Sequence, residues 1–296
     1  MRYFRQWSQL LKRKIKLFAE RRLIDRYRNS GSIPWSDGYK LNKREYIESI
    51  LQSMDLLSKF RVCENLPPGY GWRIDERVVE YPWVFSRLDD QSSRLLDAGS
   101  AMNYDHLLSR LIKQGKDITV FNLAPEKRNY SDRKISYHFG DLRNMPFKDE
   151  WFDVIVCIST LEHVGMDNRG YGADKAEYSK DGHKIAALEL LRVLRKNGQL
   201  LITLPFGKYQ EIERDSGVFM RQFDSELIAE FRELFISCNV HTCFYQYTSS
   251  GWIISSEDRC NRVEYFNIHA TKRMDPDYAA AARSVVCLEI LRGNRS

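Results

Sequence analysis

Several polar residues stand directly after apolar runs of strand length, and they are the best candidates in this chain for chemistry. They are Asp97 near the end of residues 94–98 with Gly99 and Ser100 after it, Asp141 after residues 135–139, and Ser159, Glu162 and His163 after residues 152–158. In an open α/β sheet, ligands bind at the carboxyl ends of the strands. A glycine there lets the backbone approach a ligand closely. Asp141 could accept from an exocyclic amine such as that of adenine; a turn or helix-capping role is the alternative.

His163 is the candidate general base. An imidazole titrates near neutral pH, and an aligned base is worth roughly 10²–10⁴-fold in rate. Glu162, its neighbour in sequence, could orient the ring or bind a substrate hydroxyl. The alternative is a structural histidine that is hydrogen-bonded to a neighbouring loop, and we expect that role for His138 and His183.

The sequence lacks several motifs, and their absence argues against particular cofactors, metals and substrates. The stretch LLDAGSAMN does not have the three spaced glycines of a dinucleotide fingerprint, which argues against a nicotinamide cofactor. The spacing of Glu162, His163 and Asp167 matches none of the specific metal motifs, so no metal is expected. No Asn/Asp-Pro-Pro-Tyr/Phe tetrapeptide follows residues 152–158, where STLEHV stands instead. A nucleic-acid substrate is therefore not expected.

From residue 91 onward the sequence alternates strand-like and helix-like segments, which is typical of a parallel sheet covered on both faces. The clearest helix is expected at 182–196, with Asp181 as its N-cap and Gly198 just past its end. We expect a doubly wound α/β fold with a seven-stranded, mostly parallel sheet whose last two strands form an antiparallel pair. The expected strands are 94–98, 118–123, 135–139, 152–158, 199–204, 240–247 and 284–291.

Three regions divide the 296 residues. Residues 1–28 form a basic amphipathic helical arm, residues 29–90 a helical cap extension, and residues 91–296 the α/β domain. The arm carries a net charge of +8 and the rest of the chain −2, so the body has no charge excess for a phosphate backbone. Hydrophobic residues make up 43% of the chain, and its apolar runs are too short to span a bilayer.

The six cysteines form no CxxC pair, and we expect neither a disulfide framework nor a zinc site. No apolar stretch typical of a signal peptide follows the basic N-terminus. A reducing, cytoplasmic compartment is therefore expected.

Four ordered motifs give the chain a resemblance to the class I S-adenosylmethionine-dependent methyltransferase superfamily: LDAGS, GDLRNMPF, FDVIVCISTLEHVG and LRVLRKNGQLLITLP. This resemblance covers about residues 90–292. Within the superfamily, the chain resembles uncharacterised bacterial methyltransferases associated with surface polysaccharide and glycan modification. That narrower likeness rests on SGSIPWSDGY, DERVVEYPWV, LDAGSAMN and STLEHVGMDN, and extends to about residue 30.

The resemblance implies S-adenosyl-L-methionine as the cofactor and assigns its site residue by residue. Asp97, Gly99, Ser100 and Asn103 match the motif at the methionine end, Asp141 and Leu142 the adenine site, and Ile158 and Ser159 the segment that backs the cofactor. Asn122 stands where an acid commonly grips the ribose hydroxyls. An amide can still donate and accept hydrogen bonds, but it lacks the charge.

The resemblance implies O-methylation of a sugar hydroxyl on a glycan or lipid-linked saccharide, with His163 as base. Residues 166–180 read as an insertion over the acceptor cleft, in which Arg169 and Tyr171 would contact substrate; a solvated loop is the alternative. A small-molecule or protein methyltransferase is the second reading. A non-catalytic partner that keeps the fold is the third, and the oligomeric state stays open.

The N-terminal arm has its own candidate partner. Apolar residues recur three, four and seven apart through residues 1–28, so one face of a helix there is apolar and aromatic. Such a helix could lie on the inner face of an anionic membrane with Lys and Arg outward. The alternative is a helix packed on its own domain or on a partner.

Overall fold

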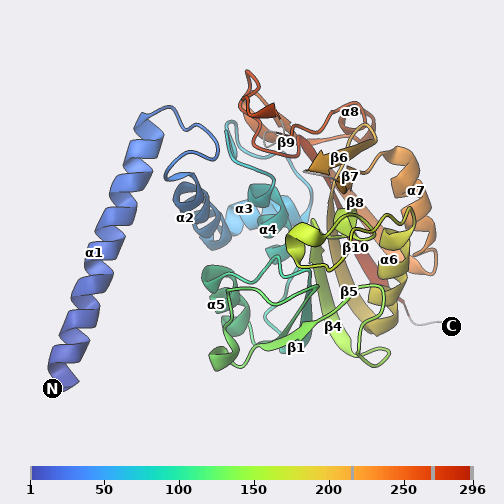
Figure 1. Cartoon of the computed structure of the whole chain (residues 1–296), viewed down its shortest axis with the longest axis horizontal. Helices are drawn as coiled ribbons and strands as arrows, with labels where there is room; N and C mark the ends of the chain where they lie inside the picture. Colours follow the sequence, from blue (N-terminus) through green and yellow to red (C-terminus); the bar gives the residue numbers. More distant parts are fainter. Residues whose placement is uncertain (1, 215–216, 268–270, 294–296) are drawn as a thin grey trace.

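The chain, seen here in a computed structural model, is described over residues 2–214, 217–267 and 271–293. Helix α1 (Arg2–Asn29) projects from a body in which helices cover both faces of a central sheet (Figure 1). The predicted helical pattern at 42–60 is two helices, α2 (Tyr39–Gln52) and α3 (Met54–Arg61), separated at Ser53. The Ser53 hydroxyl accepts from the Leu56 amide at 3.3 Å and so caps α3.

The central sheet confirms the doubly wound, mostly parallel α/β class. The strand order is β3-β2-β1-β4-β5-β10-β8-β9, with β10 antiparallel to both of its neighbours. The sheet has eight strands rather than the seven expected, because β9 pairs with β8 at the edge. The strands are β1 (Ser93–Ala98), β2 (Lys116–Asn122), β3 (Ser136–Phe139), β4 (Phe152–Ile158), β5 (Leu194–Pro205), β8 (Cys238–Thr248), β9 (Gly251–Ser255) and β10 (Ser284–Arg292).

Two hydrophobic cores lie on opposite faces of this sheet. Successive strand residues point to alternate faces, so Leu95 joins one core and Leu96 the other. The first core also contains side chains of α2, α3, α5 (Asp105–Lys113) and α4 (Arg77–Phe85), and the second those of α6 (Gly182–Val193) and α7 (Ser225–Glu233). Residues 39–85 thus cover one face of the sheet and share a core with it.

The expected helix at 182–196 ends three residues early, and its cap differs. Strand β5 begins at Leu194, so Gly198 lies inside a strand and does not mark a helix end. The Asp181 side chain makes no capping hydrogen bond and pairs instead with Lys184 at 3.1 Å. Tertiary pairing of residues 199–203 with β4 therefore outweighs the helical propensity of this stretch.

A hairpin that the sequence pattern did not predict follows β5. Its strands are β6 (Gln210–Arg214) and β7 (Gly217–Gln222), and a bridge between Phe206 and Phe223 joins its base to the body. The short helix α8 (Glu257–Cys260) lies beyond β9, and three 3₁₀ turns occupy Ser131–Arg133, Leu161–His163 and Arg169–Tyr171.

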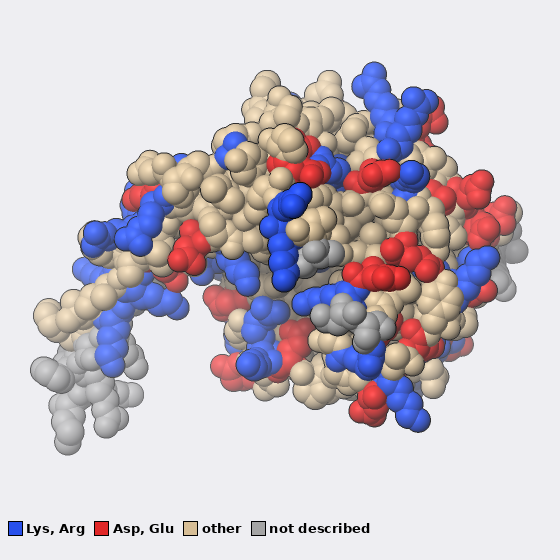
Figure 2. Space-filling view, turned by 45° about the horizontal axis from the view of Figure 1, so that its top comes forward, with Lys and Arg blue, Asp and Glu red and all other residues tan. Residues whose placement is uncertain are grey.

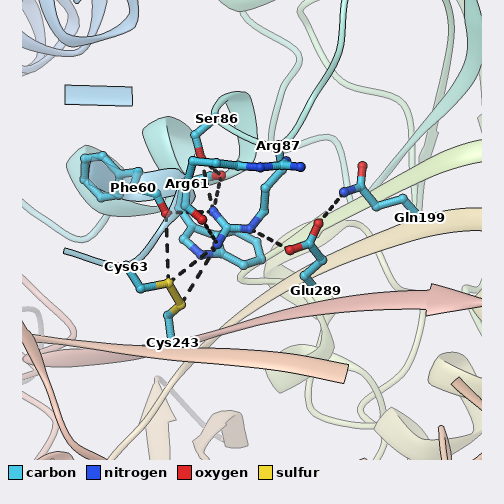
Figure 3. A network of polar contacts seen from close by, with 9 residues as sticks. Phe60, Arg61, Cys63, Ser86, Arg87, Gln199, Cys243 and Glu289 are labelled. Carbon is cyan, nitrogen blue, oxygen red and sulfur yellow. Dashed lines mark hydrogen bonds and ion pairs between the residues drawn. A yellow bond between two sulfur atoms is a disulfide. The ribbon is translucent and has the colours of Figure 1, made fainter. Parts of the chain in front are cut away.

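A buried network of hydrogen bonds and an ion pair connects helices α3 and α4 to the sheet (Figure 3). Arg87, at the end of α4, donates to Glu289 on β10 at 3.1 Å and to the Phe60 carbonyl at 3.0 Å. Beside it, Cys63 and Cys243 form a disulfide, which corrects the expectation drawn from the cysteine spacing. Disulfides persist mainly in oxidising compartments, so this pair does not favour the expected cytoplasmic location.

Only the C-terminal part of α1 docks on the body. Ile24 and Tyr27 are buried, and Glu20 accepts from Arg44 of α2 at 2.8 Å. The rest of the helix stands clear of the sheet and its covering helices (Figure 1). Within the described residues, no helix combines the length and the apolar character needed to cross a bilayer.

Candidate active site

A cavity of about 300 Å³ lies at the carboxyl edge of the sheet, where the loops after β1, β2, β3 and β4 meet. That is the edge at which parallel sheets bind ligands. The loops supply Gly99, Ser100, Ala101, Asn122, Leu123, Glu126, Gly140, Asp141, Leu142, Arg143, Ile158, Ser159, Thr160 and His163. Helix α4 adds Arg77 and Tyr81, and the segment 166–180 adds Tyr171, Ala173, Lys175 and Glu177.

The loop after β1 is shaped by a buried carboxylate and a glycine. Asp97 is fully buried and accepts from the Met102 amide at 2.9 Å, which holds the turn; burial raises the pKa of Asp97 to about 7. Gly99 has φ of +103°, and a Cβ there would lie 2.2 Å from the Thr160 hydroxyl. Ser100 lines the cavity, and its buried hydroxyl has no partner among the described residues.

Asn103 supports the site from behind the cavity wall. Its side chain accepts from the Tyr137 hydroxyl at 2.9 Å and donates to the Arg128 carbonyl at 3.2 Å. Asp97 and Asn103 are therefore not among the lining residues, although both were predicted to bind the cofactor. They fix the backbone on which Gly99 and Ser100 sit.

The loop after β2 brings a carboxylate into the cavity that sequence reasoning missed. Asn122 ends β2 and donates its amide to Glu126 at 2.9 Å, and both residues line the cavity. A neighbouring amide and carboxylate can together bind a diol, because one can donate and both can accept. The signal in the sequence was the acid in LAPEK, four residues past the strand end.

The loop after β3 carries the predicted adenine-reading pair. Asp141 and Leu142 both line the cavity. Burial would raise the pKa of Asp141, but Arg143 donates to both carboxylate oxygens, at 2.9 and 2.5 Å, and holds it below its ordinary value. Arg143 also pairs with Glu177 of the segment above, at 2.8 Å. Asp141 is thus charged and tied to the covering segment.

His163 lies in the 3₁₀ turn after β4 and lines the cavity. Its Nδ1 is 2.9 Å from the Phe219 carbonyl on β7, and because a carbonyl only accepts, we assign the ring hydrogen to Nδ1. Nε2 is then free to accept a proton. Burial lowers the pKa of His163 to about 4, so the ring is neutral at pH 7.

Glu162 lies behind His163 and does not line the cavity. It is 2% exposed, and burial raises its pKa well above the ordinary value, which favours the protonated form. One carboxyl oxygen lies 3.9 Å from His163 Nε2. Burial thus disfavours the charged form of both neighbours.

Helix α4 carries a buried carboxylate next to the cavity, Glu80, which the sequence motifs did not indicate. Glu80 is fully buried and accepts from Ser159 at 2.6 Å and from Thr203 at 2.7 Å, at the ends of β4 and β5. It also pairs with Arg77, whose guanidinium lines the cavity. The only sequence signal was the charged pair three residues apart in DERVVEYPWV.

The segment 166–180 covers the cavity and is held by the β6–β7 hairpin. Arg221 of β7 is buried and donates to the Ser179 carbonyl at 3.0 Å. The Tyr171 ring stacks on Phe219 with the ring centroids 5.5 Å apart, and Tyr171 lines the cavity. Arg169 does not: it lies at the surface, bonded to Asp167 at 2.5 Å, and is not a lining residue.

No group of three or more His, Cys, Asp or Glu side chains is placed to hold a metal ion within residues 2–214, 217–267 and 271–293.

Comparison with known proteins identifies part of this architecture. Residues 96–202 match the model of a family described as a methyltransferase domain. This range runs from β1 into β5 and includes the four loops that line the cavity. No curated protein matches the chain in sequence.

Solved structures are similar to the chain at low identity. The 1,6-didemethyltoxoflavin-N1-methyltransferase of Burkholderia thailandensis, with 1,6-didemethyltoxoflavin and S-adenosylhomocysteine bound, is 12% identical with a TM-score of 0.44; the similarity covers 69% of this chain and 72% of that one. An S-adenosylmethionine-dependent methyltransferase of Thermotoga maritima is 12% identical with a TM-score of 0.43, covering 84% and 99% respectively.

Proposed function

We propose that this S-adenosylmethionine-dependent methyltransferase transfers its methyl group to a sugar hydroxyl of a glycan or lipid-linked saccharide. The observation that carries the proposal is a neutral imidazole, His163, with Nε2 free at the rim of the cavity. An alcohol must lose its proton as the new C–O bond forms, and this nitrogen is available to accept it.

The cavity residues fit the cofactor. Ser100 offers a buried hydroxyl without a protein partner, and Asn122 with Glu126 offers donors and acceptors for a ribose diol. Asp141 offers a charged carboxylate for an exocyclic amine, beside the apolar Leu142. When bound, the cofactor supplies an electrophilic methyl group on a sulfonium, which leaves as a neutral thioether. The protein therefore has no developing anion to stabilise.

The remaining residues position the acceptor and its proton. Tyr171 presents an aromatic ring for the C–H face of a sugar, while Arg77 and Lys175 supply donors for hydroxyls. His163 Nε2 takes the hydroxyl proton, and its Nδ1–H bond to the Phe219 carbonyl keeps the ring in the required tautomer. Glu162 lies beside the imidazolium that results.

The covering segment excludes water from this reaction. Residues 166–180 lie over the cavity and are bonded to the adenine side through Arg143 and Glu177. Holding two reactants together in a dry cleft supplies much of the rate in a displacement of this kind.

Methyl transfer from isotope-labelled cofactor tests the acceptor class. The full chain is incubated with a cell extract that is then split into lipid-linked glycan, protein, nucleic acid and small molecules. We expect label in the lipid-linked glycan fraction, stable to protease and nuclease and released with the saccharide. A His163→Ala variant is the background control. Label found only in protein or in small molecules would overturn the acceptor assignment.

A further inference from the structure

Helix α1 has two apolar faces, and only one of them is used by the fold. Ile24 and Tyr27 are buried against the body near the C-terminal end of the helix. On the other side, Trp7, Leu11, Ile15 and Phe18 are 69%, 46%, 60% and 65% exposed. We call these four residues the outer stripe.

The outer stripe is a continuous surface. Its members are spaced four, four and three residues apart, so at 3.6 residues per turn they fall within a sector of about 80°. At a rise of 1.5 Å per residue, the stripe is about 16 Å long. Ile24 and Tyr27 point to the opposite side of the same helix, so the body does not obstruct an approach to the stripe (Figure 1).

Basic side chains flank the outer stripe on both sides. Lys14 and Arg21 lie along one edge, and Lys12 and Arg26 lie along the other. Arg22 lies one turn beyond Phe18 in line with the stripe, and all five side chains are exposed. Figure 2 shows Lys and Arg side chains along the projecting arm. Of the acids in this helix, Glu20 faces α2 through its bond to Arg44, and Asp25 lies beyond the end of the stripe.

This combination points to an anionic bilayer as the occupant. A second copy of the chain would bring the basic flanks of two stripes together, and like charges repel. A nucleic acid would pair with the basic residues but would not need exposed Trp, Leu, Ile and Phe side chains. An anionic membrane surface satisfies both features, because apolar side chains enter the acyl boundary while Lys and Arg meet the headgroups.

We propose that α1 lies on the surface of an anionic membrane through the outer stripe, with Trp7 and Phe18 inserted and the basic flanks on the lipid headgroups. The helix would hold the methyltransferase domain at the surface without crossing the bilayer. The proposal does not depend on which acceptor is methylated.

Vesicle flotation of the full chain tests the proposal with two matched variants. Phe18→Glu and Leu17→Glu make the same charge change at neighbouring exposed positions, but Leu17 lies about 100° away from the outer stripe. We expect the unaltered chain to float with phosphatidylcholine vesicles that contain phosphatidylglycerol, and not with phosphatidylcholine alone. Phe18→Glu should lower the binding constant about tenfold or more, and Leu17→Glu should leave most of it.

The salt dependence of binding and the oligomeric state also test whether α1 binds the membrane. Binding should weaken in about 0.5 M salt, because the basic flanks are screened. The proposal is overturned if the unaltered chain does not bind anionic vesicles, or if the two variants lose binding equally while circular dichroism shows both folded. It is also overturned if light scattering finds a dimer that Phe18→Glu turns into a monomer, since a second copy would then cover the stripe.

Discussion

Burial sets the protonation of the groups around the cavity at the residue scale. The same loss of solvation lowers the pKa of His163 to about 4 and raises that of Glu162 well above its ordinary value, so burial disfavours the charged form of both neighbours. Arg143 bonds both oxygens of Asp141 and holds the pKa of that carboxyl below its ordinary value, although burial acts to raise it. The cavity therefore combines a neutral, base-competent side with a charged side for the nucleoside.

His163→Ala should lower kcat at least about a hundredfold while cofactor affinity stays nearly unchanged, because the base acts on the acceptor and not on the cofactor. Steady-state kinetics and equilibrium binding of S-adenosylhomocysteine measure the two effects. His138→Ala is the control, since His138 is exposed on β3 and its ring contacts Phe147. Full activity in His163→Ala would remove the assignment of the base.

Glu126→Gln should weaken cofactor binding about tenfold, because the ribose hydroxyls would lose a charged acceptor of hydrogen bonds. Fluorescence or equilibrium dialysis with the cofactor measures the change, and Glu64→Gln, at an exposed position outside the cavity, should have no effect. If both variants bind the cofactor equally well, Glu126 does not serve the ribose.

At the element scale, the apolar strands of the central sheet could be predicted from the sequence, but the hairpin that packs beside the cavity could not. Strands β1, β2 and β4 are predictable because each is an apolar run that ends in polar residues, and β5 because its apolar run follows a glycine. The β6–β7 hairpin was missed because its strands are mostly polar and alternate weakly in hydrophobicity. It nevertheless supplies the Phe219 carbonyl that orients His163.

Contacts between distant segments were beyond the reach of sequence patterns. The disulfide joins Cys63 and Cys243 across 180 residues, and neither stands in a motif. Arg77 enters the cavity only because Glu80 bonds the ends of β4 and β5. Such positions depend on how α4 packs against the sheet, which local periodicity does not encode.

Arg87→Met should lower the free energy of unfolding by about 3–5 kcal/mol, because the buried Glu289 would lose its cationic partner and keep only its hydrogen bond from Gln199. Urea denaturation measures the change at pH 7 with the disulfide intact. Arg259→Met removes an exposed arginine and should stay within about 0.5 kcal/mol of the parent. Equal stability of the two variants would show that the ion pair between Arg87 and Glu289 does not stabilise the packing of α4 on β10.

The whole molecule separates a body that contains the cavity from a basic arm. Residues 1–28 carry a net charge of +8 and the rest of the chain −2, and most of α1 stands away from the domain that holds the cavity (Figure 1). The body, by contrast, buries several titratable groups in uncharged form. Its stability should therefore depend on pH in a way that the exposed arm does not affect.

The free energy of unfolding should fall as the pH rises from 6.5 to 8. Burial raises the pKa of Asp97 to about 7, that of Glu76 to about 8 and that of Glu162 well above its ordinary value. Over this range these carboxyls outweigh His106, His163 and His183, whose pKa burial lowers to about 4, so the folded chain binds more protons than the unfolded chain. The stabilising contribution of the carboxyls is present at low pH and is lost as the pH rises through the folded pKa, by about 1 kcal/mol for a carboxyl like Asp97. Urea denaturation at the two pH values measures this, and equal or greater stability at pH 8 would contradict it.

Calorimetric titration of the full chain with S-adenosylhomocysteine tests the central claim most directly, because that claim is that the cavity at the carboxyl edge holds the cofactor. We expect one site per chain with a dissociation constant in the micromolar range, about −8 kcal/mol. The absence of binding up to about 1 mM ligand, in a chain that circular dichroism shows to be folded, would contradict the account.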